Sequence, residues 1–395
     1  MDDKPRTRRY WLLVLVLTGL TLAWLSTQRH PVGEIPELTY GSETVVAQVE
    51  KVLEEGTVTL GDHTQPYQVL QVRLLEGEYA GVPMQIEYAK YQTYPVVHLF
   101  RPGERLLVSL NKQPDGTLNA FYADRVRAPQ LAWLGALFLA AILLISGWKG
   151  LRALLAMAYS LAVVIVYIIP HILAGEDPVR TSILGAMVLL GVTLYLTYGW
   201  TLKTHAAALS MVLSLLLTGL LAWFFVAFTQ LTGYGDENAL YLLQFAGATI
   251  NLRGLLLGGM IIGALGVLDD LVTTQAAAVF ELHAANPAQP LSHLIRRAMH
   301  IGQDHVAATV NTLVLAYAGS SLPMFLLFSL GHTPWGKLLN FEFIAEEVVR
   351  TLVGSLGLIA AVPLTTLIAA VLARNIARLG AKAAWFGPVG ESHGH

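Results

Sequence analysis

Eight apolar runs dominate this chain, and most of them are long enough to cross a lipid bilayer. They cover residues 10–26, 131–147, 151–170, 179–200, 206–231, 254–280, 306–330 and 352–373. A transmembrane helix needs about 20 apolar residues. Composition agrees, because only 13% of the 395 residues are charged, against about 25% in a soluble domain. We therefore expect an α-helical polytopic membrane protein with about eight transmembrane helices.

The first apolar run follows a basic segment, and two interpretations of it are open. Lys4, Arg6, Arg8 and Arg9 precede residues 10–26, as they would in a cleaved signal peptide. However, no small-x-small cleavage site follows, and Trp24 stands where small residues are needed. We therefore interpret this run as an uncleaved membrane anchor.

Basic residues predict which ends of the helices face the cytoplasm. Cytoplasmic loops carry an excess of Lys and Arg. If successive helices cross the membrane in opposite directions, most of the basic residues near the helix ends fall on the same side. They are the basic residues of the N-terminal segment, Lys149, Arg152, Lys203, Arg296, Arg297, Arg374, Arg378 and Lys382. This pattern predicts a multi-pass membrane protein with both termini in the cytoplasm, which in a bacterium would place it in the inner (cytoplasmic) membrane.

Residues 30–129 differ from the rest of the chain, because their pattern indicates short strands. Partly alternating, β-branched segments cover residues 45–49, 57–60, 67–74, 84–88 and 105–110. Glu54, Glu55 and Gly56 suggest a turn between the first two. Five or six such strands predict a small extracytoplasmic β-barrel of the OB type, inserted after the first helix.

The charge of this β domain argues against nucleic acid as a partner. Acidic residues outnumber basic ones 13 to 8 over residues 30–129, whereas an OB-type domain that binds nucleic acid is basic. We expect the domain to be a structural module or to dock a protein partner, and the alternative is a ligand-binding domain. The lipid bilayer is the other expected partner, and the sequence leaves the oligomeric state open.

The four parts of the chain follow from these patterns. Residues 1–29 form the basic cytoplasmic N-terminus and the anchor helix, and residues 30–129 form the β domain. Residues 130–375 form a seven-helix membrane domain, and residues 376–395 form a cytoplasmic tail.

The segment 251–283 combines closely spaced glycines with two adjacent acids. Gly259, Gly263 and Gly266 share one helical face, and small residues at this spacing let two helices approach closely. Asp269 and Asp270 follow within the same apolar segment, where a charged residue costs at least about 2.5–3.5 kcal/mol and usually marks a pathway or a proton relay.

Helical geometry separates the two acids. Asp270, Thr274 and Glu281 lie on one stripe, whereas Asp269 points about 100° away. We expect Asp270 to face the protein interior and to be the functionally sensitive acid. The alternative is that one acid pairs with a neighbouring helix while the other reaches cytoplasmic water.

Polar residues of the next apolar run complete the candidate ion or proton path. His305 and Thr309 lie on one face of it, and Asp270 or Glu281 could meet His305 if the two helices pack together. Polar side chains in such a position can also serve simply as contacts between helices.

Several classes of site are excluded by the sequence. The chain has no cysteine, which removes disulfides, zinc–thiolate sites and iron–sulfur clusters. No Walker P-loop, GxGxxG turn, HExxH motif or GxSxG elbow is present. We therefore expect neither an enzyme nor a cofactor or metal site.

The chain resembles the YibE/F-like family of bacterial membrane proteins. The resemblance covers most of residues 40–375 and rests on residues 263–270 (GALGVLDD), 281–282, 311–319 (NTLVLAYAG), 340–350 and 363–365. It implies an anchor helix, an outer β domain and seven further spans, with one acid after the glycine-rich helix. It implies no established activity.

The sequence is compatible with two functions. The first is a transporter, or an ion- or proton-coupled membrane machine, that uses the acids of the glycine-rich helix. The second is a non-transporting scaffold or assembly factor whose β domain docks a partner.

Overall fold

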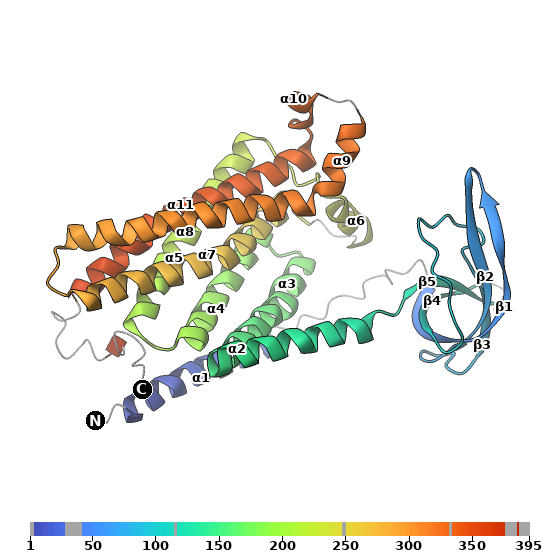
Figure 1. Cartoon of the computed structure of the whole chain (residues 1–395), viewed down its shortest axis with the longest axis horizontal. Coiled ribbons are helices and arrows are strands. Elements are labelled where there is room, and N and C mark those ends of the chain that lie inside the picture. The colour runs from blue at the N-terminus through green and yellow to red at the C-terminus, as the bar shows by residue number, and fades with distance from the viewer. Residues whose placement is uncertain are drawn as a thin grey trace. The chain divides into compact units, whose positions relative to one another are not determined.

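A computed structural model describes residues 4–27, 42–113, 117–246, 250–331, 334–375 and 385–386 (Figure 1). The predicted cytoplasmic tail, residues 376–395, lies outside the described residues apart from 385–386. The chain divides into two compact units. One is Glu34–Ile145, and the other combines Met1–Gly33 with Ser146–His395.

The first unit contains a five-stranded antiparallel sheet in the order β3-β2-β1-β4-β5. The central strand β1 pairs with β2 along one part and with β4 along another, so the sheet curves into a half-barrel (Figure 1). The strands are β1 (Ser42–Leu60), β2 (His63–Leu74), β3 (Pro83–Tyr88), β4 (Arg105–Lys112) and β5 (Leu118–Arg125).

Alternating side chains build the core of this sheet. In β4, Leu106, Val108 and Leu110 are buried while the residues between them are more exposed. The rings of Tyr88 and Tyr122 close one end of the core, with centroids 4.6 Å apart. Burial raises the pKa of Tyr122 to about 12.

The sequence-based outline of this unit is correct in its main strands and wrong in one connection. Glu54, Glu55 and Gly56 do not form a turn, because β1 runs through them and pairs them with Val69, Gln68 and Tyr67 of β2. Register shifts beside Glu54 mark bulges in the strand. The sheet is a half-barrel, so closure into an OB-type barrel is not confirmed.

The second unit is helical, and α2 leads into it from the first. The helical elements are α1 (Lys4–Thr27), α2 (Ala128–Val163), the π-helical turn η1 (Val164–Ile168), α3 (Ile169–Leu173), α4 (Pro178–Tyr198), α5 (Leu202–Phe228), α6 (Glu237–Ala246), α7 (Leu252–Ala285), α8 (Leu291–Ser320), α9 (Leu322–Leu330), α10 (Trp335–Leu338) and α11 (Glu342–Asn375).

Among the described residues, five helices are long and apolar enough to cross a membrane. A sixth span results if α8 and α9 are counted together as one span that is bent by 60° between them. Two of the eight predicted spans fall in one apolar segment, Ala128–Leu173, which is interrupted at Gly147, where φ is 52° and ψ is −129°. The first predicted span is a shorter apolar helix, Leu13–Thr27. Apolar helices are thus confirmed, but the number eight is not.

Helix α7 lies at the centre of the bundle, where it contacts α4, α5, α8 and α11. Buried small and polar residues mediate these contacts, as is usual between membrane helices. Gln275 of α7 is 1% exposed; its side-chain nitrogen donates to the carbonyl of Ala298 in α8 and to the hydroxyl of Thr366 in α11. One glutamine therefore ties three helices together.

A carboxylate at the start of α11 holds the loop that follows α5. Glu342 accepts hydrogen bonds from the backbone N–H and the hydroxyl of Thr232, at 2.5 and 2.6 Å, and from the N–H of Gly233 at 3.0 Å. Hydrogen bonds to a charged group contribute about 1.5–3 kcal/mol each.

We expect Glu342→Ala to lower the free energy of unfolding by about 2–3 kcal/mol, less than the sum for three hydrogen bonds, because water can replace the acceptor at the exposed Thr232. Chemical denaturation in detergent, followed by circular dichroism, measures the loss. The control is Glu237→Ala, at an exposed site in α6, which should change stability by no more than about 0.5 kcal/mol. Equal loss in both variants would contradict the role of Glu342.

Candidate functional site

One stripe along α7 is left uncovered, although most of the helix is buried. The helix begins at Leu252, after Asn251, whose side-chain oxygen accepts a bond from the N–H of Gly254 at 3.0 Å. The exposed residues recur every three or four positions and therefore share one face. We call Gly259, Gly263, Gly266, Asp270 and Thr274 the open stripe.

The glycines of this stripe do not make the close helix crossing that their spacing predicted. A Cβ atom at Gly259, Gly263 or Gly266 would meet no described atom within 4 Å. The close approaches lie at other glycines, since a Cβ would collide with Ser182 at Gly258 and with Thr218 at Gly357. The expectation is therefore wrong for contacts within the described chain: the small residues border open space.

Helix α8 explains this open space, because only its first half is fully buried. Its buried residues are Leu294, Ala298 and Gly302, all in its first half. A Cβ at Gly302 would collide with Val362 of α11 and with the Gln275 side chain. Beyond Gly302 the residues of α8 are exposed or half-buried. A groove consequently opens between α7, α8 and α11.

The surroundings of the two adjacent acids are the reverse of those expected, because Asp269 is the more buried one. The side chain of Asp270 is 76% exposed on the open stripe. Asp269 is more buried, and its Oδ1 atom has no hydrogen-bond partner among the described residues. It lies on the side of α7 that carries Thr273, whose hydroxyl donates to Tyr198 of α4. The expectation that Asp270 faces the interior is wrong, since α4 covers the Asp269 side while α8 leaves the Asp270 side open.

Asp270, Thr274 and His305 come together across the groove, as the sequence suggested for an acid and His305. His305 Nδ1 lies 3.3 Å from the Thr274 hydroxyl oxygen, and its Nε2 lies 4.0 Å from Asp270 Oδ2. Thr309, one turn further along α8, donates to the carbonyl of His305 and is half-buried. Glu281 is exposed near the end of α7, roughly 16 Å along the helix axis from Asp270.

The hydrogen bonds of Thr274 indicate where the protons of His305 lie. The Thr274 hydroxyl donates to the backbone carbonyl of Asp270 at 2.7 Å, so its oxygen is left to accept from His305 Nδ1–H. Nε2 then faces the carboxylate of Asp270. A proton at Nε2 makes the imidazole cationic and forms an ion pair with Asp270, and its departure ends that pair. The cluster is thus chemically able to take up and release one proton.

A small cavity continues the groove beyond this cluster. It has a volume of about 90 Å³ and is bordered by Gly259 and Gly263 of α7, Leu313 and Tyr317 of α8, and Arg350 of α11. A water molecule needs at least about 10–15 Å³ of such space. The cavity therefore has room for several water molecules beside the open stripe.

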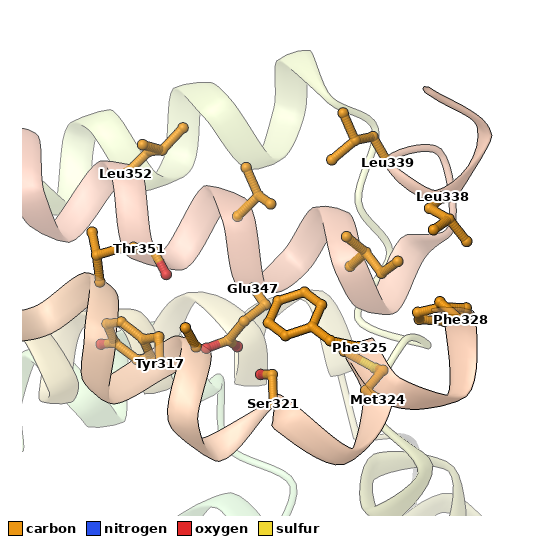
Figure 2. A pocket seen from close by; sticks show the side chains of 14 residues that line it. Tyr317, Ser321, Met324, Phe325, Phe328, Leu338, Leu339, Glu347, Thr351 and Leu352 are labelled. Carbon is orange, nitrogen blue, oxygen red and sulfur yellow. The ribbon is translucent and has the colours of Figure 1, made fainter. Parts of the chain in front are cut away.

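A larger, mostly apolar cavity of about 280 Å³ is also bordered by Tyr317. It lies between the end of α8, α9, α10 and the start of α11, and Glu347 points into it near Tyr317 and Ser321 (Figure 2). Glu347 Oε2 is 3.5 Å from Arg350 Nε, so an ion pair joins residues that line the two cavities.

Arg350 and Glu347 are site residues that the sequence did not identify. Their i, i+3 spacing next to an apolar run was available as a signal. However, the last predicted apolar run begins at residue 352, so both residues fell outside the predicted spans. The structure instead joins them to that span in one helix, α11.

The helical unit corresponds to a known family. The family described as YibE/F-like protein matches residues 134–375. This range includes every residue of the groove, whereas the strands β1–β5 precede it, so the likeness expected over most of residues 40–375 is confirmed for the helical part only. No curated protein and no solved structure shows a significant match to the chain.

Proposed function

The chain belongs to the YibE/F-like family, and from this premise we propose that it is a membrane transporter or ion-coupled membrane machine that moves protons along the groove. The observation that carries the proposal is the cluster of Asp270, Thr274 and His305 on the open stripe of an otherwise buried apolar helix. An ionised carboxylate at bilayer depth is costly in contact with lipid. An exposed Asp270 therefore favours a groove that contains water.

The proposed path contains two clusters of polar residues. Protons exchange between Asp270 and His305 in the first cluster. Water in the 90 Å³ cavity connects it to the second cluster, the ion pair of Arg350 and Glu347. Glu281 lies toward the end of α7 that we place in the cytoplasm. Tyr317 borders both cavities, and the bend between α8 and α9 follows it by one turn.

The orientation in the membrane is part of the same proposal. The basic residues assign the start of α8 and the end of α11 to the cytoplasmic side, because cytoplasmic ends are rich in Lys and Arg. This puts both termini in the cytoplasm and the β domain outside it, in the inner membrane of a bacterium.

The decisive measurement is proton flux in proteoliposomes that contain the purified full-length protein and a pH-sensitive dye. A potassium diffusion potential should drive a flux well above that of empty liposomes. A folded protein that gives no flux would refute the proposal and leave the scaffold function, in which the β domain docks a partner.

Cysteine labelling gives an independent prediction, since the chain has no cysteine of its own. A water-soluble thiol reagent should modify Gly263→Cys at least about 10-fold faster than Leu216→Cys, because thiols react as the thiolate and need water to ionise. Leu216 is an exposed apolar residue of α5 and serves as the lipid-facing control. Equally slow labelling of both sites would show that the open stripe is dry and contradict the proposed path.

A further inference from the structure

A third cavity lies within the unit that contains the β domain. It has a volume of about 680 Å³ and is bordered by the turn before β4, the end of β5 and the first turn of α2. Arg105, Arg125 and Arg127 line it together with one carboxylate, Glu104. This concentration of arginine stands out in a domain whose acidic residues outnumber its basic ones.

Arg125 has a structural part in this cavity. Its guanidinium donates to the carbonyls of His98 and Leu99, lies 3.6 Å from Glu104, and is positioned over the ring of Phe100 at 4.2 Å from the centroid. These contacts hold the end of β5 in place and supply one wall of the cavity.

Arg105 and Arg127 are more exposed and are the residues available to a ligand. Arg127 donates to Asp124 at 2.7 Å, and this bond lowers the pKa of the Asp124 carboxyl group. Both arginines are exposed at the cavity. Arginine binds phosphate oxygens with two parallel hydrogen bonds, which makes it the preferred partner of that group.

The position of the cavity on the chain indicates where such a phosphate would come from. The first turn of α2 contributes Pro129, Gln130 and Leu131 to the lining, and the positive end of a helix dipole favours an anion. The apolar part of α2 starts at Leu131, and Trp133 is 79% exposed. Exposed tryptophan at the end of an apolar helix is typical of the headgroup level of a bilayer. The arginines therefore lie next to the level of the lipid phosphates.

We propose that this cavity binds a phosphate group through Arg105 and Arg127, and that a phospholipid headgroup presents it. Three arginines, Arg105, Arg125 and Arg127, face two carboxylates, Glu104 and Asp124, so the site keeps a net positive charge that favours anionic over zwitterionic headgroups. Phosphate binding at this site does not depend on transport through the groove.

The test is titration of the full-length protein in neutral detergent with phosphatidylglycerol, followed by native mass spectrometry. We expect Arg105→Gln/Arg127→Gln to weaken the apparent affinity at least about 10-fold. The matched control is Arg73→Gln/Lys112→Gln, which removes the same charge from other parts of the domain and should change the affinity less than about 2-fold. Arg125 is left intact in both variants because it supports β5.

Competition identifies the source of the phosphate. Glycerol 3-phosphate that displaces the lipid would support a site for phosphate groups of either source, whereas lipid binding that resists it would support the headgroup alone. Equal affinity of wild type and Arg105→Gln/Arg127→Gln, with both folded by circular dichroism, would overturn the proposal. Equal weakening in the control variant would overturn it too, because the effect would then be one of net charge.

Discussion

Asp270→Asn is expected to abolish proton flux in proteoliposomes, with a loss of at least about 100-fold, while the protein keeps its fold. Asparagine has nearly the shape of aspartate but cannot carry a negative charge or release a proton. The side chain is exposed on the open stripe, so its replacement disturbs no core packing. What it removes is the partner of His305, and proton exchange between the two groups should then stop.

The matched control for this variant is Glu176→Gln, which neutralises an exposed acid in the loop between α3 and α4. It should leave the flux unchanged within about 2-fold. His305→Gln should reproduce the loss, since it removes the other half of the pair. If Asp269→Asn stops the flux and Asp270→Asn does not, the more buried acid is the coupling group and the assignment made here is wrong.

Gly302→Leu is expected to unfold α8 from the bundle, with a loss of about 3 kcal/mol or more in the free energy of unfolding. A side chain at this position would collide with Val362 and with Gln275, which is itself bonded to Ala298 and Thr366. Overpacking of a core typically costs about 1–3 kcal/mol, and here the buried hydrogen bonds of Gln275 would be lost as well.

Gly263→Leu is the comparison, because its side chain would enter open space. It should change the stability by no more than about 0.5 kcal/mol, and it should block flux by filling the small cavity. Unfolding in detergent, followed by circular dichroism, measures both variants. Greater destabilisation by Gly263→Leu than by Gly302→Leu would contradict the packing described for α8.

The β domain shows what strand patterns can and cannot reveal. Four of the five strands were predicted, because their buried residues alternate with exposed ones. The sequence Glu54-Glu55-Gly56 suggested a turn, yet it is part of β1, since a bulged strand can hold polar residues that face solvent. Strand β5 was missed because its residues are half-buried in a weak alternation.

The helical unit shows a different limit. Helical periodicity placed Asp270 and Thr274 on one stripe and Asp269 elsewhere, and this was correct. It could not tell which face is covered, because that depends on how far α8 diverges from α7. The spacing of Gly259 and Gly263 is as compatible with an open groove as with a close helix crossing. The pair of Arg350 and Glu347 was missed since no sequence pattern shows that Tyr317 approaches it.

The deeper burial of its first half gives α8 the geometry of a lever. Its fulcrum is the segment from Leu294 to Gly302, and the remaining arm to Ser320 is roughly 27 Å long. A tilt of roughly 10° at Gly302 would displace the far end by roughly 5 Å, close to the pitch of one helical turn. Motion of a few tenths of an ångström near Gln275 would thus be magnified at Tyr317. Substitutions along the arm should accordingly cost little stability, whatever their effect on flux, whereas substitutions between Leu294 and Gly302 should destabilise the fold.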